Sequence, residues 1–288
     1  VFNNASWESG GRFYGGWWQQ ISEDLRANIM INDNPVVEID FNAMHIALLK
    51  AEVAEKSERD LVSVKDNEPP QGSDFFQKFS ASRLIRADEI SNADDDPYTL
   101  NKTIFPTKNE FDQRKAVKLL VLMAINAKSR ALAFSAFRSD KAKGDPLRKM
   151  TNDELSQLLD AFIEKHPKLE PFLCTGKGVE LMYVDSRIAE SVIEQLTDKS
   201  IPVLCVHDSF IVADKQKHEL LRAMEHACKQ IIGRSIKSDY KKQSIGDWEA
   251  ETRRRGKAPE WRMKRIVRCS GYMKRMGLHP YDDYAEFF

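Results

Sequence analysis

Two aspartates follow short apolar runs that lie far apart in the chain. Asp40 ends a run that starts at Val36, and Asp208 ends a run that starts at Ile201. Short apolar runs of this kind are typical of buried strands, so each carboxylate would lie at a strand end. Two converging carboxylates can hold two divalent metal ions, the arrangement that drives in-line phosphoryl transfer. The pair therefore predicts phosphoryl-transfer chemistry if Asp40 and Asp208 meet in space.

Each aspartate also has an ordinary structural interpretation. His207 and Asp208 interrupt an apolar stretch, and a polar pair is costly if it is buried without partners. A hairpin tip that faces a cleft resolves this cost, and so does an ordinary turn with a hydrogen-bonded Asp. Asp40 could equally cap the helix that follows it. Taken singly, neither residue decides between these readings.

A basic stripe forms the third candidate feature. Arg114, Lys118 and Asn126 fall at four-residue intervals or multiples of them, which places them along one side of a helix. Arg114 and Lys118 could bind a triphosphate, because cations neutralise charge that moves onto leaving phosphate oxygens. The alternative is a solvated basic face.

These residues need a strand, a hairpin and several helices to position them. We expect a strand over 36–41 and a hairpin over 202–212. The helices expected from periodicity span 43–56, 107–137, 151–165, 180–197 and 215–232. Capping boxes mark two of the starts, Thr107 with Glu110 and Thr151 with Glu154. Residues 62–105 predict surface loops and short helices, and the whole pattern indicates an α+β protein.

Composition bounds the class of protein. The chain has 288 residues, of which 42% are hydrophobic and 31% charged, and its formal net charge is zero. No apolar stretch reaches the roughly 18 residues of a membrane helix, so we expect no membrane partner. The four cysteines form no C-x-x-C pair, which argues against zinc and favours a cytoplasmic location. The basic segment 234–275 is either a phosphate-contacting surface or a solvated helix face.

The order of the motifs adds a family resemblance. Along the chain stand Gly11-Arg12, the strand with Asp40, Arg114-x-x-x-Lys118 and His207-Asp208-Ser209. This order resembles the superfamily of family A DNA polymerases and single-subunit RNA polymerases, and in particular compact primase-polymerases of mobile elements. The likeness covers about residues 10 to 215. It implies a right-hand palm, made of a small antiparallel sheet with helices, and helical fingers.

The resemblance also implies a domain division. The first part of the palm would span 1–60, the fingers 61–150, the second part of the palm 151–232, and a basic C-terminal extension 233–288. About ten residues precede Arg12, too few for a thumb or a proofreading nuclease. We therefore expect the thumb to be absent or reduced, in either a fragment or a minimal enzyme.

Residue roles follow from the same resemblance. Asp40 and Asp208 would be catalytic and would hold two Mg²⁺ ions, with Mn²⁺ as an alternative. Lys118 would be catalytic and, with Arg114, would bind the nucleotide; Arg12 and His207 would bind the primer and template. Tyr98, Trp17 and Trp18 are candidates to stack bases, with core packing as the alternative, favoured for the tryptophans.

Three departures from the family pattern bear on nucleotide choice. Asn126 replaces the aromatic that stacks on the incoming base, so nucleotide selection is in question. His45 stands at the sugar-gate position, where its bulk would exclude a ribose 2′-hydroxyl and favour deoxynucleotides. Ser209, in contrast, resembles the RNA enzymes. Because steric exclusion acts directly on selection, we favour DNA synthesis.

The sequence thus predicts a template-dependent nucleotidyltransferase, a DNA polymerase or primase-polymerase. Its partners would be a template–primer, nucleoside triphosphates, and an accessory protein or a missing N-terminal region. One alternative is a single-subunit RNA polymerase or RNA-primer primase. The other is a catalytically inactive nucleic-acid-binding accessory protein, against which the presence of both aspartates argues.

Overall fold

The computed structural model describes residue 7 and residues 10–63, 96–105 and 112–242. Its strands are β1 (Met30–Ile31), β2 (Asn34–Phe41), β3 (Leu204–Val206), β4 (Ser209–Ala213) and β5 (Ser238–Lys242). Its α-helices are α1 (Glu23–Arg26), α2 (Met44–Ser63), α4 (Gln113–Asn126), α5 (Arg130–Asp140), α6 (Asn152–Lys165), α7 (Gly178–Asp198) and α8 (Lys217–Ile232). Short 3₁₀ helices include η1 (Trp17–Gln19), η2 (Pro146–Lys149), η3 (Pro167–Phe172) and η4 (Asp214–Gln216).

A small antiparallel sheet forms the centre of the fold, which confirms the expected α+β class. Its strand order is β1-β2-β4-β3, and β5 pairs with β2. Neighbouring residues of a strand point to opposite faces, so β2 divides its side chains between two environments. Ile39 and Phe41 lie on one face, where Phe41 meets Phe210 of β4 edge-on. Glu38 and Asp40 lie on the other.

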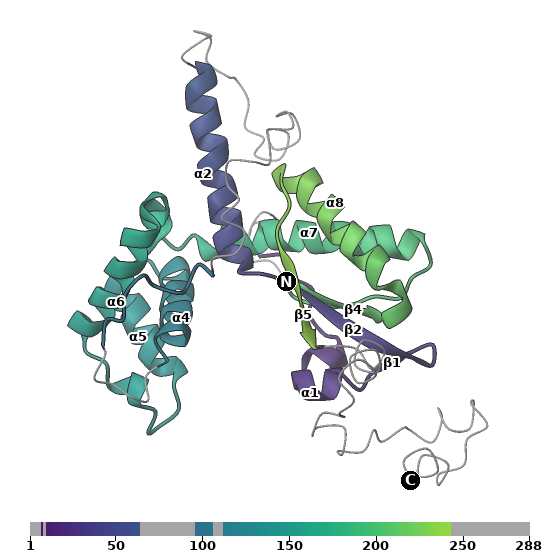
Figure 1. The fold of residues 1–288 in the computed structure, drawn as a ribbon, viewed down its shortest axis with the longest axis horizontal. Helices are drawn as coiled ribbons and strands as arrows, with labels where there is room; N and C mark the ends of the chain where they lie inside the picture. Colours follow the sequence, from purple (N-terminus) through teal and green to yellow (C-terminus); the bar gives the residue numbers. More distant parts are fainter. Residues whose placement is uncertain (1–6, 8–9, 64–95, 106–111, 243–288) are drawn as a thin grey trace.

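Two long helices, α7 and α8, cover the first face of this sheet (Figure 1). Their apolar residues join those of β2 and β4 in the main core, and α2 packs against α7. The opposite face carries a smaller apolar cluster of Ile31, Val36, Val206, Ile211 and Ala213. This second face therefore combines a modest apolar area with the polar groups that surround Asp40.

Helices α4, α5 and α6 pack against one another as a separate group on the other side of α2 (Figure 1). Helix α6 begins with the expected capping box, in which Thr151 accepts from the Glu154 amide and the Glu154 side chain accepts from the Thr151 amide. The hairpin and the helices expected over 180–197 and 215–232 are also present, as β3–β4, α7 and α8. Helix α2 extends past residue 56, the expected end.

The single long helix expected over 107–137 is wrong. Asp112 caps a helix that begins at Gln113, and the chain is extended at Ala127 and Ser129. Ser129 then caps α5 by accepting a hydrogen bond from the Leu132 amide. Because an extended Ser cap competes with helix continuation, the periodic pattern is cut into α4 and α5. The capping box at Thr107 and Glu110 lies outside the described residues.

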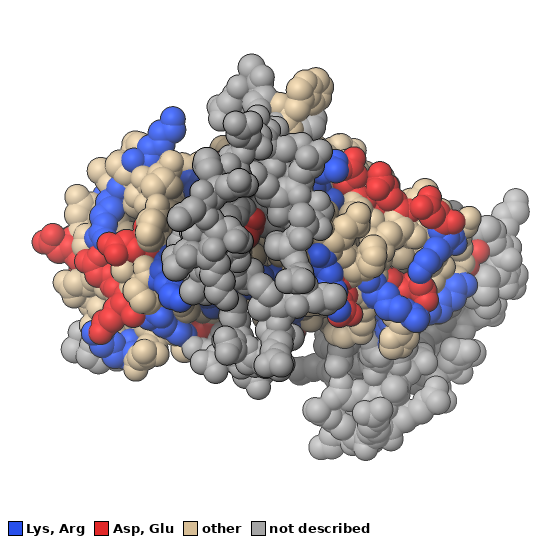
Figure 2. Space-filling view, turned by 90° about the horizontal axis from the view of Figure 1, so that it is seen from above, with Lys and Arg blue, Asp and Glu red and all other residues tan. Residues whose placement is uncertain are grey.

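Charges of both signs are interspersed over the described surface of the face drawn in Figure 2. This distribution fits a net charge of zero. None of the helices in the described part of the chain has the length and apolar character needed to span a bilayer. Most of the loops expected over 62–105, and most of the basic segment 234–275, lie outside the described residues.

Candidate active site

The hairpin tip brings Asp208 beside Asp40. Asp40 pairs with Ser209 in the β2–β4 register, and the Phe41 amide donates to the Asp208 carbonyl oxygen across 3.2 Å. The end of β2 and the two-residue turn between β3 and β4 are therefore held together by backbone hydrogen bonds. The charge of Asp208 raises the pKa of Asp40, which places the two carboxylates within electrostatic reach. The structure brings together the pair on which the sequence argument depends.

Asp40 lies in an environment that disfavours its own negative charge. Burial, and after it the charge of Asp208, raises the pKa of Asp40 to about 6. Lys241 opposes this shift, with its Nζ 3.3 Å from Asp40 Oδ2. The other oxygen, Oδ1, is buried and has no hydrogen-bond partner among the described residues. A carboxylate oxygen buried in this way is a good ligand for a cation.

A charged network supports Asp40 on the same face of the sheet. Arg26 Nε donates to Glu38 Oε2 across 2.9 Å, and both side chains are buried. Ser209 donates to Glu38 Oε1 at 2.9 Å. Lys241 Nζ lies 3.6 Å from the same Glu38 oxygen, and so bridges Glu38 and Asp40. This network ties β2 to the first residue of β4 beside the hairpin tip.

A second ion pair, in which Asp185 is buried and Arg12 half-buried, flanks the site from the helix side. Arg12 Nε donates to Asp185 Oδ2 across 2.7 Å, and its Nη2 lies 3.4 Å from His45 Nε2. Burial is the largest cause that raises the pKa of Asp185, to about 6, while Arg12 opposes it. Burial and the charge of Arg12 lower the pKa of His45 to about 4, so His45 is neutral near pH 7. Arg12 therefore links α7 and α2 beside the carboxylate pair.

His207 lies at the hairpin tip with φ of 58°, in the left-handed region that non-glycine residues rarely adopt. Its ring meets the Tyr14 ring edge-on with centroids 5.3 Å apart, and its Nδ1 is buried without a partner among the described residues. Burial and Arg12 lower the pKa of His207. A positive φ here is what a two-residue hairpin turn requires, so the turn geometry itself fixes where the His207 ring lies.

The cations of α4 lie beside Asp96 and Tyr98. Arg114 donates to Asp96 with two nitrogens, at 2.5 and 3.2 Å. Lys118 Nζ lies 6.0 Å from the centre of the Tyr98 ring. Burial, and with it the charges of Asp96 and Asp208, raises the pKa of Tyr98 to about 12. Lys118 thus lies over the Tyr98 ring, whereas Arg114 is already paired with the Asp96 carboxylate.

Asn126 is the last residue of α4, and the contacts of its side chain are with Leu122 and Gly178 instead of with Arg114 or Lys118. Its Nδ2 donates to the Leu122 carbonyl oxygen, and its side chain abuts Gly178 at the start of α7. A Cβ at Gly178 would overlap the Asn126 amide, so these two residues fit closely. Asn126 is therefore a predicted site residue for which we see no link to the carboxylate pair.

A divalent metal fits the Asp40–Asp208 pair on the evidence of the donor atoms. Oxygen ligands suit Mg²⁺, and a bound cation would satisfy the buried Asp40 Oδ1 and offset the repulsion between the two carboxylates. Within the described ranges, no three His, Cys, Asp or Glu side chains gather as a metal site. The candidate is therefore a two-carboxylate centre whose remaining ligands would come from substrate and water.

Sequence reasoning left several residues of the site without an assigned role, among them Asp185, Glu38 and Lys241. Asp185 falls on the apolar face of α7, in phase with Leu181 and Ile188, and this phase is a readable signal for a buried partner. Glu38 alternates with Asp40 in β2, which is also readable. Lys241 carries no such signal, because its place depends on how β5 pairs with β2.

Comparison of the chain with protein-family models and with curated proteins finds no match. The functional argument therefore rests on the residues themselves and on their geometry.

Proposed function

We propose that the protein is a template-dependent nucleotidyltransferase that extends a nucleic-acid primer, as a DNA polymerase or primase-polymerase. One observation carries the proposal: Asp40 and Asp208 adjoin at the end of β2, and a buried oxygen of Asp40 lacks a partner among the described residues. The family resemblance in motif order supports the same reaction. The palm and fingers correspond, in this proposal, to the sheet with α7 and α8 and to the α4–α6 group.

The residues divide the work of the reaction by their chemistry. Asp40 and Asp208 would hold the divalent ions, whose chemistry when bound would be to lower the pKa of the primer 3′-hydroxyl and to offset charge on the leaving pyrophosphate. Arg114 and Lys118 bind the triphosphate and neutralise the charge that develops on it, and Lys118 holds a proton for the pyrophosphate. Arg12 is oriented by Asp185 to position the primer end.

Sugar selection is the finer part of the proposal. His45 is neutral, half-buried, and held beside Arg12, where a bulky ring would exclude a 2′-hydroxyl. Ser209 is buried, and its hydroxyl donates to Glu38, so packing alone accounts for a serine there. These two observations favour deoxynucleotides. An NTP-using enzyme remains the alternative that the assay below separates.

The test is primer extension by Asp208→Asn and Asp40→Asn on a primed DNA template with Mg²⁺, with dNTPs and NTPs supplied separately. Removing either carboxylate should lower incorporation by about a thousandfold or more, because each loses a metal ligand. Asp198→Asn, an exposed position at the end of α7, is the matched control and should extend normally. Circular dichroism checks that the variants are folded.

Three results would count against the proposal or part of it. Full incorporation by Asp208→Asn would remove the two-metal mechanism. No incorporation by the wild-type chain on any template, together with Mg²⁺-independent binding, would favour the inactive accessory protein. Preference for NTPs would instead support the RNA polymerase or RNA-primer primase.

A further inference from the structure

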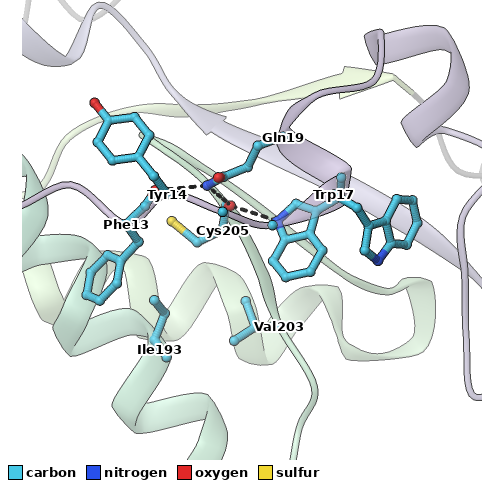
Figure 3. Close-up of a pocket in the computed structure, with 10 residues that line it drawn as sticks. Phe13, Tyr14, Trp17, Gln19, Ile193, Val203 and Cys205 are labelled. Atoms are coloured by element: carbon cyan, nitrogen blue, oxygen red, sulfur yellow. Dashed lines mark hydrogen bonds between the residues drawn. The ribbon is translucent and has the colours of Figure 1, made fainter. Parts of the chain in front are cut away.

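A pocket of about 370 Å³ lies beside the candidate active site, at the β3 edge of the sheet. One wall consists of residues 13–19, and the other comes from Ile193 of α7 and from Val203 and Cys205 (Figure 3). Four of the lining side chains are aromatic: Phe13, Tyr14, Trp17 and Trp18. The proposed reaction does not use this pocket.

The wall is built by a specific set of hydrogen bonds. Trp18 Nε1 and Gln19 Nε2 both donate to the Cys205 carbonyl oxygen at 2.9 Å, and Gln19 Nε2 also donates to the Phe13 carbonyl oxygen at 3.0 Å (Figure 3). The free edge of β3 is thereby covered by side chains. Gly16 leaves room for the Trp18 ring, which a Cβ at that position would overlap. The pocket is thus held in shape without a ligand.

Three of its aromatic side chains are not used by the core. Phe13 is 43% exposed, Tyr14 56% and Trp17 59%, so the expected core role does not hold for Trp17. Exposed aromatic side chains gathered in a hollow indicate a binding surface. Tyr14 also touches His207, which joins the pocket to the turn that carries Asp208.

We propose that this pocket binds an unpaired nucleobase of a single-stranded nucleic acid next to the active site. The inference deepens the proposed function and rests on it for the identity of the polymer. Aromatic rings stack on any base, and a volume of this size accommodates one nucleotide. Among the described residues no Lys or Arg lines the pocket, so a base, and not a phosphate, is the group it suits.

Gln19 supplies a polar contact for such a base. Its Nε2 is fixed by two carbonyl acceptors, and this assignment leaves its Oε1 as an acceptor. Among the described residues, no hydrogen bond to Oε1 is formed. An exocyclic amine or a ring N–H of the base can donate to it. Because Tyr14 of the pocket contacts His207, the bound base would lie close to Asp208 and to the primer end in the proposed reaction.

The test measures binding of fluorescein-labelled oligothymidylate by anisotropy, with the full chain, in EDTA and without triphosphates. The Phe13→Ala/Trp17→Ala variant should bind at least about tenfold more weakly, because stacking surfaces are removed. Phe13→Leu/Trp17→Phe keeps bulk, and one aromatic ring, and should bind better than the alanine pair. Leu132→Ala removes an equally exposed apolar side chain on α5, 57% exposed, and should bind like the wild type.

An abasic oligonucleotide of the same length separates stacking from charge. We expect it to bind wild type and the alanine pair equally. Equal binding of oligothymidylate by wild type and the alanine pair, or no binding by wild type, would overturn the inference. Because the assay contains no metal or nucleotide, a wild-type chain that fails to incorporate nucleotides leaves a positive binding result standing, and the reverse also holds.

Discussion

The charges around Asp40 explain why a cation would bind at this residue and not at its neighbours. Two buried carboxylates are paired with guanidinium groups, Glu38 with Arg26 and Asp185 with Arg12. Asp40 has only the Lys241 ammonium among the ion pairs of the described residues, and Lys241 also serves Glu38. The shortage of positive charge is therefore concentrated where Asp40 and Asp208 meet.

His45 should make the stability of the protein depend on pH. Its pKa is about 4 when folded, against about 6.5 in an unfolded chain, so the unfolded state binds more protons between these values. Stability is then present above pH 6.5 and is lost as the pH falls toward 4. Between pH 7 and pH 5 we expect His45 to cost about 2 kcal/mol of the free energy of unfolding.

His45→Gln isolates this contribution in urea denaturation at the two pH values. The comparison with wild type matters because Asp40 and Asp185, with raised pKa values, contribute the opposite slope between about pH 4 and pH 6. The variant should lose less stability on acidification than the wild type. Parallel losses in both proteins would show that the His45 ring is not buried as a neutral group.

The two aspartates could be singled out from the sequence because each ends an apolar run, and this pattern can be recognised without knowledge of the fold. The residues that support the pair were only partly predictable. Asp185 and Glu38 share the phase of buried neighbours, but the partners Arg12 and Arg26 come from irregular or very short segments. Lys241 depends on a register shift in the β2–β5 pairing, which sequence periodicity does not encode.

Among the secondary-structure elements, those with strong local sequence signals were predicted correctly. A capping box marked α6, and apolar periodicity marked α7 and α8. The break between α4 and α5 was not predicted, because the apolar periodicity continues across it. The N-cap residue Ser129 is what starts a new helix there. Strands β1 and β5 are short, and pairing with β2 defines them.

The junction of α4 and α7 should be unusually sensitive to a small substitution. Alanine normally stabilises a helix relative to glycine by up to about 1 kcal/mol. At Gly178, however, a Cβ would overlap the Asn126 amide, so Gly178→Ala should destabilise the protein by about 1–3 kcal/mol. Chemical denaturation measures this difference.

The double variant Gly178→Ala/Asn126→Ala tests the cause. Removing the Asn126 amide should restore part of the lost stability, giving a non-additive double-mutant cycle. Additive losses would mean that the overlap is relieved elsewhere, and a stabilising Gly178→Ala would contradict the close fit.

At the scale of the whole molecule, the residues that the proposed reaction uses come from two structural groups. The sheet with α7 and α8 carries the carboxylates, and α4 carries Arg114 and Lys118 (Figure 1). Tyr98 lies beside the α4 cations, with the Lys118 Nζ 6.0 Å from the centre of its ring. Sequence reasoning supplied both groups but not the Asp96–Arg114 pair, because a contact across an irregular segment leaves no periodic signal.

That pair leads to a prediction about nucleotide binding. In the structure the Arg114 guanidinium is paired with the Asp96 carboxylate, whereas in the proposed mechanism it binds the triphosphate. A nucleotide must therefore displace Asp96 before it pairs with Arg114. The Arg114 side chain is 50% exposed, and partly exposed ion pairs contribute at most about 1 kcal/mol. Asp96→Asn should accordingly tighten nucleotide binding by up to about fivefold.

A fluorescent nucleoside triphosphate titrated into wild type and Asp96→Asn measures this change. Asp160→Asn, which breaks the exposed pair with Arg130 on the same helical group, is the matched control and should leave affinity unchanged. The gain should shrink at high salt, where the Asp96–Arg114 attraction is screened in the wild type as well. Weaker binding by Asp96→Asn would instead mean that Asp96 orients Arg114 for the nucleotide, and unchanged binding would place the triphosphate away from Arg114.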